Sequence, residues 1–229
     1  MPAPIAVALD APDVDTAARW ADAVHRYVSV LKVGLELFYR YGPDVVDVVR
    51  GGTGCGLFLD LKLHDIPVTV AGAARSVARL RPMYVTVHAS GGADMVRAAV
   101  DAAPDVCVAG VTLLTSLNAD ALHAGGVAGS TSDAVLRYGL LAVGAGARAL
   151  VCSPQEVAAL RREVGPDITL ITPGVRPAGS GADDQARVAT PRQAIADGAD
   201  LLVIGRPITG ARDPGAAAAA LAADLAHVN

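Results

Sequence analysis

Apolar segments of strand length recur along this 229-residue chain, and a segment of helical length follows each of them. The strand-like segments are residues 5–10, 30–33, 56–62, 84–89, 106–114, 149–152, 168–172 and 201–205. The helical segments are residues 14–28, 35–49, 69–80, 93–102, 133–144, 154–164, 191–197 and 214–227. Strands that alternate with helices in this way predict a parallel sheet covered by the helices.

The number of strand–helix units indicates how this sheet closes. Eight units in 229 residues average roughly 29 residues each, close to the ~250-residue size of a (β/α)8 or TIM barrel. A doubly wound open sheet is the alternative, but no G-x-G-x-x-G motif follows the first strand. No stretch reads as a linker, so we expect a single (β/α)8 barrel domain over residues 1–229. The Gly- and Pro-rich residues 173–190 are then a long functional loop.

The composition suits such a barrel. Hydrophobic residues make up 52% and aromatic residues 3% of the chain, so Val, Leu, Ile and Ala must form the core, as in buried parallel strands. The mean hydropathy is +0.41. However, the longest stretch without Asp, Glu, Lys or Arg is the 14 residues 106–119, which is too short for a transmembrane helix. The first residues contain no basic segment, so we expect neither a signal peptide nor a membrane partner.

Cysteine content and net charge bear on location and partners. The three cysteines, Cys55, Cys107 and Cys152, are widely spaced. We expect reduced, mostly buried thiols and a cytoplasmic protein. The net charge is −4 and no basic run is present, which argues against nucleic acid as a partner. A small anionic substrate stays compatible with this charge, because the charge around a site decides what binds there.

The third predicted strand carries charges on one face. In residues 56–62, a period of two places Phe58, Asp60 and Lys62 on one face and three leucines on the other. We expect the leucines to meet the helices. Asp60 and Lys62 then point into the barrel at its C-terminal mouth, where such barrels carry their active sites.

Two neighbouring strand ends bring further charges to the same mouth. Asp10 ends the first strand, Lys32 lies near the end of the second, and Asp65 follows the third in the next loop. A structural ion pair is the alternative interpretation of any single pair. Charges on three successive strand ends favour a functional site, because buried charges are costly unless they are paired or used.

The last two strands predict a phosphate site. Gly205 and Arg206 follow the eighth strand, and Arg176 lies in the loop after the seventh. In these barrels the loops after strands seven and eight often hold a phosphate, and a guanidinium can bind it with two hydrogen bonds. Each arginine alone is also compatible with a solvated loop charge, but on adjacent loops the two favour phosphate binding.

With these residues the sequence resembles the orotidine 5'-monophosphate decarboxylase family, which catalyses the last step of pyrimidine nucleotide synthesis. The resemblance runs along the whole chain, and its most specific part is the D-x-K-x-x-D-I-P segment 60–67. The other matching segments are 7–10, 31–34, 88–89, 114–116, 172–176, 183–185 and 204–207. The resemblance implies a nucleotide substrate, no cofactor, no metal and a homodimer.

The resemblance also implies roles for the charged residues. Lys62 is similar to the group that protonates C6 of the pyrimidine, and Asp60 to the group beside the substrate carboxylate. Lys32 and Asp65 complete an alternating lysine–aspartate array, to which Asp65 reaches from the second subunit. The residues similar to substrate contacts are Asp10 and Lys32 at the ribose, Asp60 at the carboxylate, Thr115 and Gln185 at base or phosphate, Arg176, Gly205 and Arg206 at the phosphate, and Ile66 and Thr69 from the partner.

The implied reaction needs charges of this kind. Loss of CO2 from C6 leaves a carbanion in the ring plane, and most decarboxylases delocalise such charge into a cofactor. Without a cofactor, electrostatics arranged in advance at the reacting carbon must replace that electron sink. The Lys62 ammonium can stabilise the negative charge and then deliver its proton, and the Asp60 and Asp65 carboxylates favour its charged form.

Three other functions stay open at this point. A related Mg²⁺-dependent phosphosugar decarboxylase or synthase shares the D-x-K-x-x-D pattern, but Lys32 stands where such an enzyme needs an acid. A Schiff-base aldolase would use Lys62 or Lys32 as an uncharged nucleophile, which neighbouring carboxylates disfavour. A non-catalytic phosphate-binding protein would not explain charges of both signs at one mouth.

Overall fold

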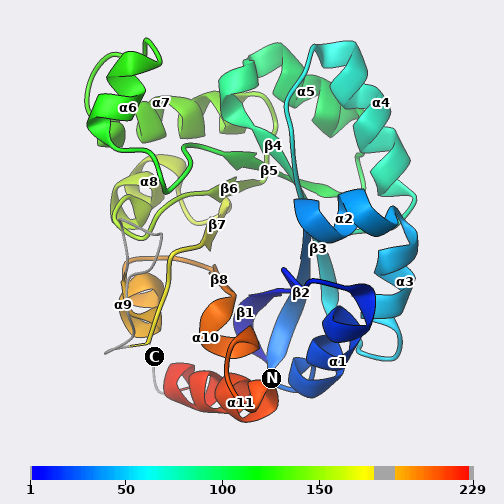
Figure 1. Ribbon diagram of the computed structural model, residues 1–229. Coiled ribbons are helices and arrows are strands. Elements are labelled where there is room, and N and C mark those ends of the chain that lie inside the picture. The colour runs from blue at the N-terminus through cyan, green and yellow to red at the C-terminus, as the bar shows by residue number, and fades with distance from the viewer. Residues whose placement is uncertain (1, 178–188, 227–229) are drawn as a thin grey trace.

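Eight parallel strands close into a barrel in chain order in the computed structural model, which describes residues 2–177 and 189–226 (Figure 1). The strands are β1 (Ala3–Ala8), β2 (Val28–Gly34), β3 (Gly56–Leu63), β4 (Tyr84–His88), β5 (Cys107–Val111), β6 (Ala149–Val151), β7 (Thr169–Thr172) and β8 (Leu201–Ile204). Pairing of Ile5 in β1 with Leu202 in β8 closes the ring. The predicted (β/α)8 barrel is confirmed.

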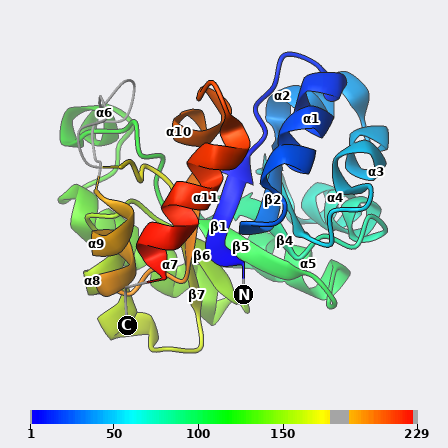
Figure 2. The same ribbon diagram turned by 90° about the horizontal axis from the view of Figure 1, so that it is seen from below.

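Helices surround this ring (Figure 1). They are α1 (Val14–Val24), α2 (Leu35–Tyr41), α3 (Asp44–Arg50), α4 (Pro67–Ala78), α5 (Ala93–Ala102), α6 (Ala119–Ala124), α7 (Thr131–Gly144), α8 (Val157–Val164), α9 (Pro191–Ala196), α10 (Arg206–Thr209) and α11 (Pro214–Leu225), with a 3-10 turn at Ala89–Gly91. Seen from below, α11 lies along the outside of β1 beside α1 (Figure 2). None of the helices in residues 2–177 and 189–226 combines the length and the apolar character that a membrane span requires.

The core has two parts, as the alternation along β3 predicts. The smaller of the two clusters lies inside the barrel and consists of Ala6, Val30, Phe58, Ala109, Ala149, Ile171 and Leu201. Leu57, Leu59 and Leu61 belong instead to the larger cluster between strands and helices. Phe58 is therefore the inward residue at the base of β3, and the next inward positions on the same strand are Asp60 and Lys62.

The predicted single helix over residues 35–49 is wrong. The structure divides it into α2 and α3 at Gly42 and Pro43. Gly42 has a φ of 61° and ends α2, and Pro43 has no N–H to continue the helical hydrogen bonds. Two short helices, α6 and α10, were not expected from the sequence. In α6 the side chain of Asn118 caps the start, accepting from the N–H of Ala121 at 2.9 Å.

Other boundaries moved by a few residues. The side chains of Asp13, Thr190 and Asp213 cap the starts of α1, α9 and α11. The helix expected over residues 154–164 begins only at Val157, after a turn. The helix expected from residue 69 begins at Pro67, the first strand ends at Ala8 rather than residue 10, and the strand expected to reach residue 114 ends at Val111.

The three cysteines are free as expected, whereas most of the expected loop over residues 173–190 lies outside the described residues. Cys55, Cys107 and Cys152 are free, and Cys152 is buried while the other two are half-buried. An isolated bridge pairs Val175 with Ala189. Residues 178–188, which lie between these two residues and include Gln185, are outside the described residues.

Candidate active site

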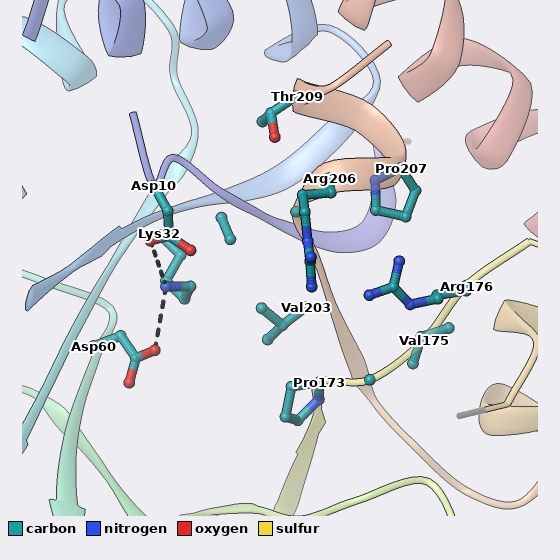
Figure 3. A pocket seen from close by; sticks show the side chains of 13 residues that line it. Asp10, Lys32, Asp60, Pro173, Val175, Arg176, Val203, Arg206, Pro207 and Thr209 are labelled. Atoms are coloured by element: carbon teal, nitrogen blue, oxygen red, sulfur yellow. Dashed lines mark hydrogen bonds and ion pairs between the residues drawn. The ribbon is translucent and has the colours of Figure 1, made fainter. Parts of the chain in front are cut away.

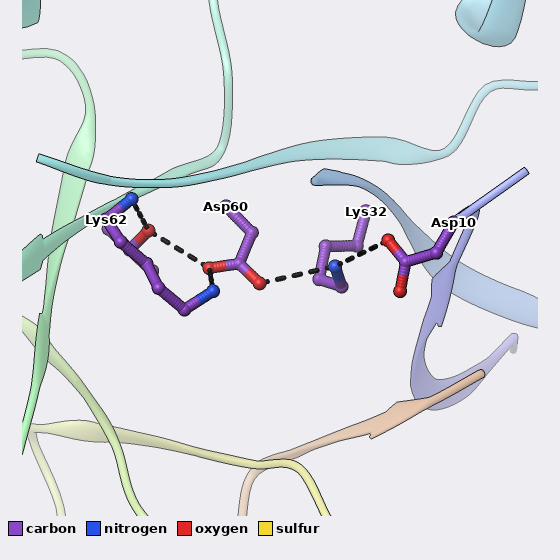
Figure 4. Close-up of polar contacts among 5 residues, drawn as sticks. Asp10, Lys32, Asp60 and Lys62 are labelled. Carbon is purple, nitrogen blue, oxygen red and sulfur yellow. Dashed lines mark hydrogen bonds and ion pairs between the residues drawn. The ribbon is translucent and has the colours of Figure 1, made fainter. Parts of the chain in front are cut away.

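Four charged side chains, from β2, β3 and the loop after β1, form one continuous array at the C-terminal mouth (Figure 4). Nζ of Lys32 lies 3.4 Å from Oδ1 of Asp10 and 3.2 Å from Oδ2 of Asp60. Nζ of Lys62 lies 2.8 Å from Oδ1 of Asp60. The structure thus brings together the four residues that the strand ends predicted, and the Asp60 carboxylate lies between two ammonium groups.

Burial differs along the array. The side chain of Lys32 is 7% exposed and that of Asp60 15%, whereas Lys62 is 28% and Asp10 58% exposed. Burial alone would lower the pKa of Lys32, but the carboxylates of Asp60 and Asp10 outweigh it and raise the pKa above its ordinary value. Burial alone would raise the pKa of Asp60, but Lys32 and Lys62 hold it below its ordinary value. Both buried groups are therefore charged at neutral pH.

A glycine at the end of β2 makes room for the side chains of Asp10 and Lys32. A Cβ atom on Gly34 would lie 2.8 Å from Oδ1 of Asp10 and 3.2 Å from Nζ of Lys32. Any larger residue would push the Asp10 carboxylate away, since the first of these distances is shorter than real Cβ contacts. This crowding explains why the second strand ends in a glycine two residues after Lys32.

Lys62 itself has an unusual backbone conformation. Its φ is 49°, in the left-handed region that a side chain disfavours. The N–H of Lys62 donates to the hydroxyl of Thr86 on β4 at 2.8 Å, and that hydroxyl donates to Oδ1 of Asp60 at 3.1 Å. Thr86 was not among the predicted site residues. Period-two alternation along β4 could have found it, because Thr86 shares a face with Tyr84.

A cavity of about 410 Å³ opens beside the array (Figure 3). Asp10, Lys32 and Asp60 lie at one side of it, and the guanidinium groups of Arg176 and Arg206 lie at the other. Arg176 is buried and comes from the loop after β7, whereas Arg206 is exposed and begins α10. The two predicted phosphate-binding arginines thus face one cavity, which Gly205 also lines.

A second, smaller cavity of about 160 Å³ lies next to the first. Phe58, Lys62 and the predicted residue Thr115 line it. Asp60, Pro173 and Val203 line both cavities, so the two are neighbouring halves of one site. Pro173 and Val203 were not predicted, although Val203 is an inward position of the eighth strand. The combined site can hold an elongated ligand with an anionic end at the arginines and a reacting end at Lys62.

The structure does not bring Asp65 to the array within one chain. Its side chain is exposed, and its Oδ1 accepts a hydrogen bond from the N–H of Ile66 at 2.6 Å. Thr69, in the first turn of α4, is also exposed. Ile66 is 62% and Val68 69% exposed, so two apolar side chains beside Asp65 and Thr69 are open to solvent. These residues form the rim of the mouth beside β3.

Metal-binding side chains do not gather at the site. Within residues 2–177 and 189–226, no three His, Cys, Asp or Glu side chains stand close enough together to hold a metal ion. The space between the carboxylates of Asp10 and Asp60, where a cation would be attracted, contains the ammonium group of Lys32.

Comparisons with known proteins agree on one family. A family model described as "Orotidine 5'-phosphate decarboxylase / HUMPS family" matches residues 3–221. The orotidine 5'-phosphate decarboxylase of Thermobifida fusca is 72% identical, with 98% of this chain and 97% of the relative covered. That of Frankia casuarinae is 62% identical over 97% and 88%. The crystal structure of the Lactobacillus acidophilus enzyme of the same name superposes with a TM-score of 0.83 at 36% identity, covering 96% and 97%.

Proposed function

This chain belongs to the orotidine 5'-phosphate decarboxylase / HUMPS family, and we propose that it converts orotidine 5'-phosphate to uridine 5'-phosphate with Lys62 as the proton donor. It is a carboxy-lyase of pyrimidine nucleotide biosynthesis. The observation that carries the proposed mechanism is the Lys32–Asp60–Lys62 array, which opens onto the cavity of Arg176 and Arg206.

The proposed reaction uses no electron sink. The bond between C6 and the carboxylate breaks, CO2 leaves, and the electron pair stays on C6 in the plane of the ring. The ammonium group of Lys62 stabilises that pair and then transfers a proton to it, forming the C6–H bond. Lys62 suits this role because its ammonium is partly exposed toward the smaller cavity and its position is fixed 2.8 Å from Asp60.

We also propose that Asp60 repels the carboxylate of the bound substrate before the reaction. A substrate carboxylate placed next to Asp60 meets a like charge, and at about 4 Å that contact is worth roughly 4 kcal/mol at an effective dielectric near 20. This repulsion disappears as CO2 leaves. Lys32 and Lys62 oppose the relief of this contact by protonation of Asp60, because they lower its pKa.

The phosphate supplies the binding energy that opposes this repulsion. Arg176 and Arg206 lie across the cavity from Asp60, so a phosphate held there fixes the far end of the nucleotide. Interactions with this unreacting group can hold the carboxylate in an unfavourable place. Asp10 and Lys32 line the cavity between the two ends, where the ribose would lie, and Thr115 lines the cavity for the base. Gln185, outside the described residues, stays a prediction as a further contact.

The proposal includes a homodimer. The ion pairs of the array within one chain do not include the exposed Asp65, and the apolar rim formed by Ile66 and Val68 lacks a cover. A second copy supplies both, if each subunit lends Asp65, Ile66 and Thr69 to its neighbour's site. We further propose a single domain and a cytoplasmic location, which the three free thiols support.

The Mg²⁺-dependent phosphosugar enzymes of the same superfamily are less compatible with the site. The relatives described above are named orotidine 5'-phosphate decarboxylase. In addition, the Lys32 ammonium lies within 3.4 Å of both carboxylates that a divalent cation would need. We therefore expect full activity after dialysis against a chelator.

The absorbance of orotidine 5'-phosphate provides the direct test. We expect the purified protein to decrease it at a rate proportional to enzyme concentration, with uridine 5'-phosphate and CO2 as products. Addition of chelator and removal of small molecules by gel filtration should leave the rate unchanged. A protein that binds the nucleotide but leaves its absorbance constant would overturn the proposal.

A further inference from the structure

The sheet is irregular next to Lys62. Leu59 of β3 pairs with Val85 of β4, but the next pair joins Leu63 with Val87. Three residues of β3, Asp60 to Lys62, therefore stand opposite the single residue Thr86. An interruption of this kind bends a strand and re-aims its side chains, and it is frequent beside active sites. The irregularity contains both the general acid and the carboxylate next to it.

The side chain of Thr86 fills the place of the missing backbone pairing. Its hydroxyl accepts from the N–H of Lys62 at 2.8 Å and donates to Oδ1 of Asp60 at 3.1 Å. The same Oδ1 accepts from Nζ of Lys62 at 2.8 Å. These three hydrogen bonds form a closed ring. The side chain of Lys62 bonds Oδ1 of Asp60 directly, and the backbone N–H of Lys62 is connected to the same oxygen through the hydroxyl of Thr86.

Lys62 and Asp60 depend on the Thr86 hydroxyl for different reasons. The left-handed backbone of Lys62, with φ of 49°, is disfavoured for a residue with a side chain and persists only where its surroundings hold it. Asp60 already accepts from the two ammonium groups, and the third donor fixes the plane of its carboxylate. Thr86 is fully buried, so water cannot replace its hydroxyl.

We propose that Thr86 is a positioning residue for the decarboxylation: its hydroxyl holds the Lys62 backbone in the left-handed conformation and orients the Asp60 carboxylate, so that the Lys62 ammonium stands ready at the reacting carbon. This inference rests on the proposed function of Lys62. It concerns a residue that touches no substrate itself and acts through the two residues that do.

The chain offers a matched control in Thr112, just after β5. Thr112 is also buried, and its hydroxyl donates to the carbonyl oxygen of Val151 at 3.0 Å. Its methyl group lies toward α7, where a Cβ atom on Gly139 would meet it at 3.8 Å. Thr112→Val therefore removes a buried hydroxyl of the same kind without touching the array, and it reports what such a loss costs the fold alone.

The test compares Thr86→Val, Thr86→Ser and Thr112→Val by steady-state kinetics and by affinity for uridine 5'-phosphate. We expect Thr86→Val to lower kcat roughly 10- to 100-fold, as for a displacement of about 1 Å at a reacting group, while KM and product affinity change by less than about threefold. Thr86→Ser, which keeps the hydroxyl, should retain most of kcat, and Thr112→Val should keep wild-type kcat. Thr86→Ala serves in the same role if Thr86→Val does not fold.

Three results would overturn the inference. They are a wild-type kcat in Thr86→Val or Thr86→Ala, a loss of kcat in Thr86→Ser equal to that in Thr86→Val, or a loss of kcat in Thr112→Val equal to that in Thr86→Val. A crystal structure of Thr86→Val separates this inference from the proposed function: the φ of Lys62 should leave the left-handed region even if wild-type protein proves inactive on orotidine 5'-phosphate. An unchanged Lys62 backbone in that structure would contradict the positioning role whatever the activity.

Discussion

Lys62 and Asp60 stand two residues apart on β3, and Nζ of Lys62 lies 2.8 Å from Oδ1 of Asp60. The same carboxylate is shared with Lys32, and Lys32 with Asp10, so the array itself is neutral. The arginines across the cavity add two positive charges on a chain whose net charge is −4. A substrate with a carboxylate and a phosphate is drawn to this site by local charge and against the charge of the whole molecule.

Lys62→Ala should nearly abolish turnover and leave nucleotide binding intact. A positioned general acid contributes about 10²- to 10⁴-fold, and here the same group also stabilises the carbanion, so a loss of at least ~10³-fold in kcat is expected. Titration calorimetry with uridine 5'-phosphate checks binding, and orotidylate absorbance checks turnover. Near-normal turnover in this variant would remove Lys62 from the role of acid.

Asp60→Asn should destabilise the folded protein as well as slow the reaction. The change leaves Lys32 buried beside a neutral amide, and breaking a buried pair of this kind costs about 3–5 kcal/mol. Urea unfolding at pH 7 measures this cost. The matched control is Asp94→Asn, which affects an exposed pair with Arg97 and should change the free energy of unfolding by less than about 0.5 kcal/mol.

The difference in the free energy of unfolding between wild type and Asp60→Asn should change with pH in a definite direction. The pKa of Asp60 in the folded protein lies below its ordinary value of 3.8. Its contribution to stability is therefore fully present above 3.8 and is lost as the pH falls through the folded-state pKa. We expect the difference between wild type and Asp60→Asn to stay constant from pH 7 down to about 5 and to shrink at more acid pH. A difference that shrinks already near neutrality would mean that Asp60 is not held ionised.

Arg206→Ala should reduce kcat/KM for orotidine 5'-phosphate by about 10- to 100-fold, since a hydrogen bond to a charged group is worth roughly 1.5–3 kcal/mol. For orotidine, which lacks the phosphate, the same variant should match wild type. Arg97→Ala, which removes an exposed arginine on α5, is the control and should leave both substrates unaffected. An equal loss on orotidine would show that Arg206 acts on something other than the phosphate.

Mixed dimers can show whether Asp65 acts across an interface. Lys62→Ala and Asp65→Ala should each be nearly inactive alone. Co-expressed in equal amounts, they should recover about a quarter of wild-type activity per subunit, because half of the dimers are mixed and each has one intact site. Activity no greater than that of the two parents would show that Asp65 serves its own chain, and full activity of Asp65→Ala alone would show that it serves neither.

Much of the site follows from local sequence rules. The alternation in β3 predicts that Phe58 faces inward and Leu57 outward, and the structure confirms both. The meeting of Asp10, Lys32 and Asp60 follows because parallel strands in a barrel end at one mouth. These predictions succeed because they depend only on side-chain period and strand direction.

The irregularity at Lys62 could not be predicted in the same way. A lysine with positive φ has no sequence signature, since its conformation is held by Thr86 on another strand. The break between α2 and α3 is different: Gly42 and Pro43 mark it in the sequence, and the apolar periodicity on both sides concealed it.

The pairing of β1 with β8 also sets the order in which the site can be completed. Lys32 and Lys62 lie in β2 and β3, and Asp10 lies in the loop after β1. Neighbouring segments of this kind can associate while later ones are still being synthesised. Ile5 meets Leu202 only when nearly the whole chain is available, and such distant contacts form slowly because loop-closure entropy opposes them. Arg206 follows β8 directly. The charged array can therefore assemble early, but the proposed phosphate site forms only at barrel closure. We expect nucleotide affinity to report that folding is complete.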